Sequence, residues 1–222
     1  MKKLLVMLLV LASILSITVS ASALDIGIVL PTKDEDRWLA DEAKFYELIE
    51  ENGYSAEIMY SQASAATEKT NVETLITKGA KVLIICPFDV AAAASTVELA
   101  KSEGLQVISY DRLITDTEAI DYYVAFESIK IGEAMGQYLV DSAEAHGGTG
   151  LNLYLYSGAL TDNNSFSYFR GYWNSLQPKI ADGTFIVRNS DVAMEYKDIY
   201  DLTHEQLSEI MGTAATARCW TS

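Results

Sequence analysis

The sequence predicts an α/β protein in which parallel β-sheets are covered by helices. Short apolar runs of strand length alternate along the chain with longer stretches that have helical spacing. The helical stretches end at glycine or proline, which are signals of a helix C-terminus. Alternation on this scale is typical of parallel sheets whose strands are connected by helices. The predicted strands span residues 26–30, 56–60, 82–86, 106–109, 122–125, 151–156 and 184–187.

Four helices are predicted between these strands, and each has apolar residues on one face. The last of them should stop before Pro178. The run Gly147-Gly148-Thr149-Gly150 is predicted to be a turn, because a strand follows it where a phosphate-binding loop would be followed by a helix. The apolar faces are Leu39, Ala43 and Tyr46 in residues 36–52; Val90, Ala94 and Val97 in 90–103; Ile131, Met135, Tyr138 and Leu139 in 127–145; and Phe166, Phe169, Trp173 and Leu176 in 164–177.

The first 23 residues have the features of a targeting segment that is removed on export. Lys2 and Lys3 supply its positive end, residues 4–15 are apolar, and Ala21-Ser22-Ala23 is a small-x-small cleavage pattern. The apolar stretch is too short for a lasting membrane span. We therefore expect an exported protein in the periplasm or on the extracellular face of the cell envelope.

Composition argues against several classes of function. The formal charge is −15, and an acidic surface repels nucleic-acid phosphates, so no nucleic-acid partner is expected. Cys86 and Cys219 are the only cysteines, which implies no disulfide framework. The histidines, His146 and His204, lie in unrelated segments, and no cluster has metal-ligand spacing. With no Ser-His-Asp or Cys-His set either, we expect a binding protein without metal or cofactor rather than an enzyme.

Polar side chains follow successive predicted strands at the point where each strand ends. The carboxyl ends of parallel strands share one rim of a sheet, and this rim is where open α/β sheets bind ligands. Strand 106–109 runs into Tyr110-Asp111-Arg112, which offers hydrogen-bond acceptors and fixed donors together. The candidate ligand-binding residues on these loops are Arg37, Trp38, Asp89, Asp111, Arg112, Asn163 and Asn164.

The chemistry of this set suits a sugar. Arginine donates in a planar fork to neighbouring hydroxyls, a carboxylate accepts from two, and an asparagine can do both. The face of Trp38 could cover the C–H face of a pyranose ring. Simpler roles remain open: Trp38 as a core aromatic, Asn163 or Asn164 as a helix initiator, and Asp89 as the cap of the helix that begins at Val90.

With these residues together, the chain resembles the periplasmic sugar-binding proteins that feed ATP-driven importers. The likeness is closest to the xylose-binding and multiple-monosaccharide-binding members. The matching segments occur in family order with family-like spacing. They are Pro31-Thr32-Lys33 through Arg37-Trp38, residues 79–85, Tyr110-Asp111-Arg112-Leu113-Ile114, Tyr122-Tyr123-Val124-Ala125-Phe126 and Asp162-Asn163-Asn164.

The resemblance implies a type I periplasmic-binding-protein fold, with two Rossmann-like lobes that close over a sugar. The first lobe would be residues 24–126 and would supply Arg37, Trp38, Asp111 and Arg112. The second would begin at residue 127 and supply one of Asn163 and Asn164. The implied ligand is a monosaccharide of the xylose, glucose, galactose or arabinose class, and the implied partner is an ABC permease. A membrane sensor or kinase as the partner is an open alternative.

Two features depart from the family pattern. Phe126-Glu127-Ser128 stands where the family has Phe-Asp-Asn at the first hinge crossing. The family-like helix 203–211 runs into a divergent tail from about residue 212, where relatives continue. We therefore expect an incomplete second lobe over residues 127–222 and weak or no sugar binding by this chain alone. A non-functional fragment is the alternative.

Two further classes compete with these. Paired carboxylates such as Asp89 and Asp111 could serve a glycosidase if they stood at the separation that its mechanism needs. A transcriptional repressor can use the same lobes, but it would need a basic DNA-reading segment where this chain has its targeting segment. Both are disfavoured.

Overall fold

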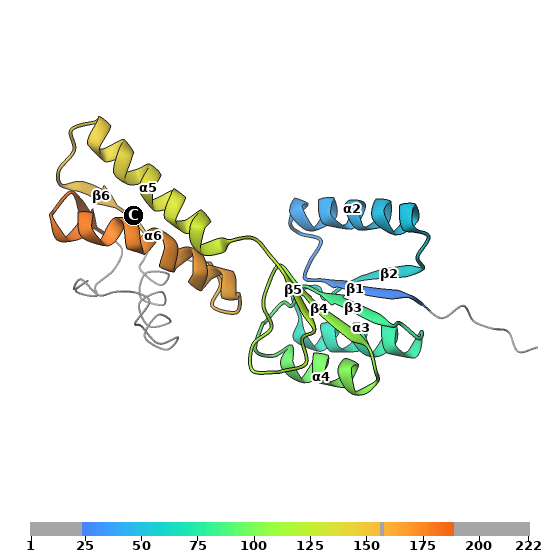
Figure 1. The fold of residues 1–222 in the computed structure, drawn as a ribbon. Helices are drawn as coiled ribbons and strands as arrows, with labels where there is room; N and C mark the ends of the chain where they lie inside the picture. Colours follow the sequence, from blue (N-terminus) through green and yellow to red (C-terminus); the bar gives the residue numbers. More distant parts are fainter. Residues whose placement is uncertain (1–23, 156–157, 189–222) are drawn as a thin grey trace, which may run out of the picture.

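The computed structural model describes residues 24–155 and 158–188 (Figure 1). The predicted targeting segment 1–23 lies outside the described residues. So do the end of the predicted strand 151–156, the predicted helix 203–211 and the divergent tail.

The larger sheet has five parallel strands in the order β2-β1-β3-β4-β5. Helix α2 covers one face and α3 and α4 cover the other (Figure 1). The chain pairs β2 on one side of β1 and then crosses to pair β3 on the other side. Beside such a crossing, the carboxyl ends of the strands open a crevice in which α/β proteins bind ligands. The elements are β1 (Ile26–Leu30), α2 (Asp36–Asn52), β2 (Ala56–Tyr60), α3 (Ala65–Thr77), β3 (Val82–Ile85), α4 (Ala94–Ser102), β4 (Gln106–Tyr110) and β5 (Tyr122–Val124).

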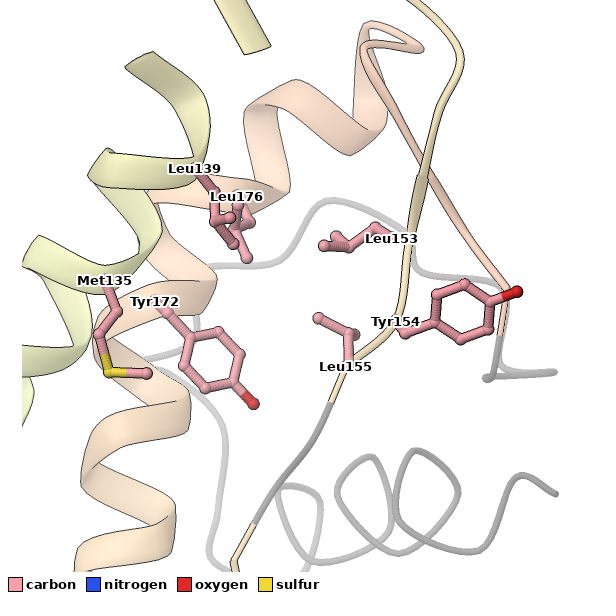
Figure 2. A pocket seen from close by; sticks show the side chains of 7 residues that line it. All are labelled: Met135, Leu139, Leu153, Tyr154, Leu155, Tyr172 and Leu176. Carbon is pink, nitrogen blue, oxygen red and sulfur yellow. The ribbon is translucent and has the colours of Figure 1, made fainter. Parts of the chain in front are cut away.

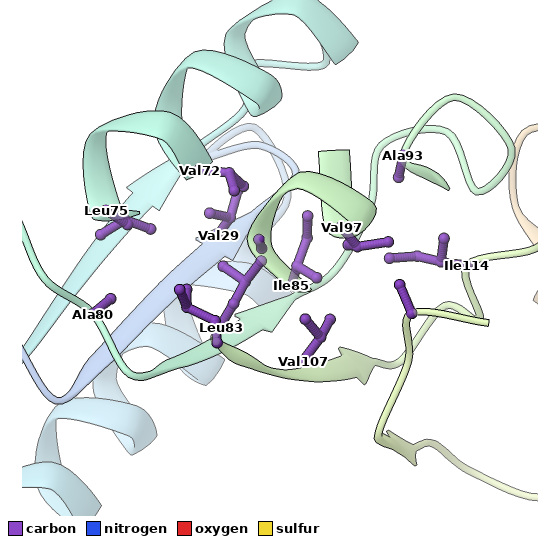
Figure 3. Close-up of a cluster of buried hydrophobic side chains, with 13 residues drawn as sticks. Val29, Val72, Leu75, Ala80, Leu83, Ile85, Ala93, Val97, Val107 and Ile114 are labelled. Carbon is purple, nitrogen blue, oxygen red and sulfur yellow. The ribbon is translucent and has the colours of Figure 1, made fainter. Parts of the chain in front are cut away.

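The apolar runs that predicted the strands form the core of this sheet. Figure 3 shows the layer beneath α3 and α4, where Val29, Leu83 and Val107 of three neighbouring strands are fully buried against Val72 and Val97. Burying such a side chain contributes about 1.5–3 kcal/mol, so this layer fixes the register of the sheet. The layer beneath α2 contains Ile28, Leu30, Trp38, Tyr60 and Cys86.

A two-stranded parallel sheet follows in the second half of the chain. Its elements are α5 (Ser128–Ala145), β6 (Leu151–Leu153), α6 (Asn163–Ala181) and β7 (Phe185–Val187). Phe169 stacks on Trp173 within its core, with ring centroids 5.5 Å apart. The predicted boundary between lobes, at residues 126–127, falls between β5 and α5 and stays a prediction.

Helices α5 and α6 approach each other backbone to backbone. A Cβ atom on Gly171 would lie 2.1 Å from the carbonyl oxygen of Ile129, and one on Gly132 would lie 2.3 Å from that of Tyr168. No side chain fits at these separations, so glycine is required at the crossing.

The prediction that Leu39, Ala43 and Tyr46 form the buried face of α2 is wrong. Leu39 and Tyr46 are 40% and 49% exposed, whereas Trp38 is buried and Phe45 and Ile49 pack beside it. Helix α2 carries two apolar stripes, and the one that includes the indole gains more by burial against the sheet.

The prediction that the apolar side of α5 is buried is also wrong, for a different reason. Met135 and Tyr138 are 53% and 72% exposed, and the side that meets α6 is the one with Gly132 and Gly136. Because α5 and α6 pack closely at these glycines, the apolar stripe of α5 lies beside the helix contact and not within it. The apolar face predicted for α6 is confirmed, because all four of its residues are buried.

Two predicted helix boundaries are also wrong. Helix α6 continues through Pro178 to Ala181, because the proline stands in its last turn and Ile180 beyond it packs against the core. Helix α4 begins at Ala94 rather than Val90. Helix α3 was not predicted individually, and its weak apolar periodicity explains why.

Candidate functional site

The loop after β4 turns sharply at Asp111. This residue has φ 63°, a left-handed conformation that aspartate tolerates better than most residues. The amide of Asp111 donates to Val124 O at 2.8 Å, and the hydroxyl of Ser109 donates to Arg112 O at 2.6 Å. The turn directs both side chains of the Asp111-Arg112 pair to the carboxyl edge of the sheet, and Asp111 is only 6% exposed.

Arg37 and Trp38, at the start of α2, meet this pair. The guanidinium of Arg37 donates to Asp111 Oδ1 at 2.6 Å. The same guanidinium lies 4.5 Å from the centroid of the Trp38 ring, and that of Arg112 lies 5.7 Å from it. The structure therefore brings Arg37, Trp38, Asp111 and Arg112 together at one edge, although they come from loops that follow β1 and β4.

Arg112 connects this cluster to two further loops. Its Nη1 donates to Pro87 O at 3.0 Å, after β3. Its Nε lies 2.8 Å from Asp162 Oδ2, just before α6, although the N–H is not aligned with that oxygen as a hydrogen bond. Burial raises the pKa of Asp162, and the charge of Arg112 opposes that rise. Asp162 was absent from the predicted ligand set.

The start of α6 is bonded directly to the loop after β4. Asn163 accepts from the amide of Leu113 at 2.8 Å. Asn164 donates to Asp111 O at 2.9 Å and accepts from the hydroxyl of Ser128 at 3.0 Å. Asp162 caps the helix by accepting from the amide of Asn164. Both asparagines thus lie at the site, and the helix start is capped by Asp162 rather than by either of them.

Two candidates have contacts that fit the simpler roles left open by the sequence. Asp89 accepts from the amides of Ala91 and Ala92 and so caps the turn that leads into α4. Trp38 is 1% exposed in this structure, its ring is covered by guanidinium groups, and its Nε1 has no partner. Their roles in ligand binding stay predictions.

Sequence reasoning missed other groups that support the site. Tyr123 donates its hydroxyl to Asp111 O at 3.2 Å. Tyr110 donates to Asp41 at 3.0 Å, and burial together with the charge of Asp41 raises the pKa of Tyr110 to about 12. Asp41 also lies 3.7 Å from Arg37 Nε. The only sequence signal for Tyr110 and Asp162 is that each stands next to a predicted ligand-binding residue.

Among the hollows near α5 and α6, two differ clearly in polarity. Asp162, Asn164 and Tyr168 are among the residues that line one with an empty volume of about 790 Å³, part of it open to solvent. The second is an apolar groove between the two helices and the β6 segment (Figure 2). Its lining residues are Met135, Leu139, Leu153, Tyr154, Leu155, Tyr172 and Leu176. The first has the polar groups that a hydroxyl-rich ligand needs, and the second has only tyrosine hydroxyls.

Within residues 24–155 and 158–188, no group of His, Cys, Asp and Glu is arranged to hold a metal ion. No helix among the same residues is long and apolar enough to cross a membrane.

The chain matches known proteins along most of its length. Residues 26–216 match the family model of the periplasmic binding protein domain. The chain is 32% identical to a multiple sugar-binding periplasmic protein of Azospirillum brasilense, over 84% of this chain and 53% of that protein. It is 29% identical to a D-xylose-binding periplasmic protein of Escherichia coli, over 76% and 49%.

Solved structures are similar in fold as well. A carbohydrate transporter solute binding protein from Chloroflexus aurantiacus, in complex with D-glucose, is 55% identical with a TM-score of 0.80, over 87% of this chain and 56% of that one. An ABC transporter solute binding protein from Clostridium phytofermentans, with bound β-D-glucose, is 29% identical with a TM-score of 0.72, over 76% and 52%. The chain spans about half the length of the curated relatives that it matches.

Proposed function

Because this chain belongs to the periplasmic binding protein domain family, we propose that it takes part in capturing a monosaccharide at the edge of its five-stranded sheet. The sugar would be of the xylose, glucose, galactose or arabinose class. Relatives with names or structures that mention glucose, xylose or multiple sugars support this class. The protein would be exported, would catalyse no reaction, and would deliver its ligand to the permease of an ABC importer.

One observation carries the proposal: Arg37 and Asn164 both bond Asp111, and the guanidinium groups of Arg37 and Arg112 both lie near the Trp38 ring. Asp111 pairs with Arg37, and Asn164 bonds the Asp111 backbone. A sugar hydroxyl both donates and accepts, so a carboxylate, an amide and guanidinium groups on neighbouring loops can satisfy adjacent hydroxyls at once.

These groups bond to one another in the structure described. A bound sugar would therefore replace hydrogen bonds that already exist between them. It would take over acceptors and donors that Asp111, Arg37 and Asn164 now supply to each other. Such an exchange gains little per hydrogen bond, about 0.5–1.5 kcal/mol. Affinity would therefore come from several bonds together with the fit of the ring. We expect the tightest binding to have a micromolar dissociation constant, which corresponds to about −8 kcal/mol.

Isothermal titration of the purified protein against D-xylose, D-glucose, D-galactose and L-arabinose tests the proposal. Binding to one of them should weaken about tenfold in Asp111→Asn, because the charged acceptor and the ion pair with Arg37 are lost. Asp116→Asn is the matched control, since Asp116 has nearly the same backbone conformation, φ 61°, and is exposed. Absence of binding to all four sugars would contradict the proposal and agree with the expectation, drawn from the sequence, that this chain alone binds sugar weakly or not at all. Equal affinity in the two variants would also contradict the proposal.

A further inference from the structure

Glu68 is a carboxylate buried next to the candidate site. It lies in the first turn of α3 and is 1% exposed. Its Oε2 accepts from the hydroxyl of Ser61 at 3.0 Å and from the amide of Phe88 at 2.9 Å. Its Oε1 is buried without a partner. A buried carboxylate with an unused oxygen is costly, so a compensating interaction is expected nearby.

The bond to Phe88 links Glu68 to the ligand-site loops. Phe88 belongs to the loop after β3, and Arg112 donates to the carbonyl of Pro87 at 3.0 Å and to that of Phe88 at 3.5 Å. The segment Pro87-Phe88 is therefore bonded through its amide to Glu68 and through its carbonyls to Arg112. Arg112 in turn faces Asp162 at the start of α6.

Charge couples the same residues. Burial raises the pKa of Glu68, while the positive charge of Arg112 favours its ionised form and the negative charge of Asp89 opposes it. Glu68 and Arg112 therefore attract each other, and both are bonded to the Pro87-Phe88 segment.

We propose that Glu68 is a positioning residue of the site: it fixes the Pro87-Phe88 segment, whose carbonyls hold the Arg112 guanidinium beside Asp162. The carboxylate does this through one oxygen that receives two donors. Glutamine in its place keeps an acceptor for those donors, but it places an amide group where Oε1 has no partner and it removes the charge that attracts Arg112. The consequence for sugar affinity rests on the proposed function, whereas the consequence for Phe88 and Arg112 does not.

NMR of the full chain tests the positioning role without any ligand. In Glu68→Gln, exchange of the Phe88 amide hydrogen should become about tenfold faster, and the side-chain resonances of Arg112 should shift. Glu73→Gln, an exposed glutamate of the same helix, should change neither signal. Equal behaviour of Phe88 and Arg112 in the two variants overturns the proposal.

A measurement on the unaltered protein covers the case in which Glu68→Gln does not fold. The Arg112 Nε resonance should follow the titration of the Glu68 carboxyl carbon as the pH is raised. If the Arg112 Nε resonance does not shift as Glu68 titrates, the positioning role is also overturned.

Sugar titration of the same variants then separates the two proposals. If the unaltered protein binds a sugar, Glu68→Gln should weaken binding about fivefold to tenfold, with Glu73→Gln unchanged. If the unaltered protein binds none while Phe88 and Arg112 respond as expected, sugar capture by this chain fails and the positioning role stands. Unweakened binding in Glu68→Gln rejects the role of Glu68 in the site.

Discussion

Asn164 donates its side-chain amide to the backbone carbonyl of Asp111 at 2.9 Å, although the two residues are 53 positions apart. The bond joins the start of α6 to the loop after β4, and the same side chain accepts from the hydroxyl of Ser128 at 3.0 Å. Asn164 is 6% exposed, so both bonds are made in a region from which water is largely excluded.

We expect Asn164→Ala to lower the free energy of unfolding by about 1–3 kcal/mol, because the Asp111 carbonyl and the Ser128 hydroxyl each lose a buried hydrogen bond. Urea denaturation followed by circular dichroism measures the change. The control is Asn174→Ala, which removes the same group at a half-buried position of the same helix and should cost less. Equal losses in the two variants would contradict the importance of the bond to Asp111.

Gly171→Ala tests the crossing of α5 and α6. The added Cβ would lie 2.1 Å from the carbonyl of Ile129, so the helices must separate, and the free energy of unfolding should fall by about 1–3 kcal/mol or more. Gly53→Ala introduces the same methyl group where nothing lies within 4 Å, at φ 69°. That change should cost only the backbone strain, about 1–2 kcal/mol. A smaller loss at Gly171 than at Gly53 would show that the helices do not meet so closely.

Arg112→Lys tests whether the planar guanidinium is needed. Lysine keeps the charge but cannot reach Pro87 O and Asp162 from one rigid group, so sugar affinity should fall about tenfold. The affinity is measured by isothermal titration with the sugar that the unaltered protein binds. Arg188→Lys, at an exposed residue bonded to Asn152, is the control and should leave affinity unchanged. Equal affinity in both variants would mean that charge alone suffices at residue 112.

The stability of the larger sheet should depend on pH through Asp25. Hydrogen bonds from Lys81 and Ser55 hold the pKa of Asp25 well below its ordinary value of 3.8. A carboxylate with a lowered pKa stabilises the fold above its ordinary pKa, and that stabilisation is lost as the pH falls toward the lowered value. Asp25→Asn should therefore flatten the dependence of unfolding free energy on pH below about 4. Urea denaturation across that range measures it, with the exposed Asp34→Asn as control; parallel curves for Asp25→Asn and the unaltered protein would contradict the prediction.

The strands and the gathering of the site residues could be predicted from the sequence, because both follow from local apolar runs and from the topology of parallel sheets. Ile28, Leu83 and Val107 are apolar where burial is complete, and Arg37 and Asp111 follow strands that end at one edge. The periplasmic binding fold and its sugar-binding relatives were likewise recognisable from motifs in order.

The sequence could not decide which side of a helix is buried. Tyr46 and Tyr138 stand on apolar stripes as regular as any, yet both are exposed. What decides is long-range: Trp38 meets the sheet in α2, and glycines meet α6 in α5. Asp162 and Glu68 were missed because their contacts, with Arg112 and with Phe88, join residues distant in the chain.

The uncovered stripe on α5 bears on how this protein behaves in a test tube. Ile131, Met135, Tyr138 and Leu139 are between 39% and 72% exposed and form an apolar strip along α5. Exposed apolar strips associate with one another, so copies of the chain should self-associate at high concentration and dissociate on dilution. Titrations at two dilutions would separate clustering of the chain from sugar capture.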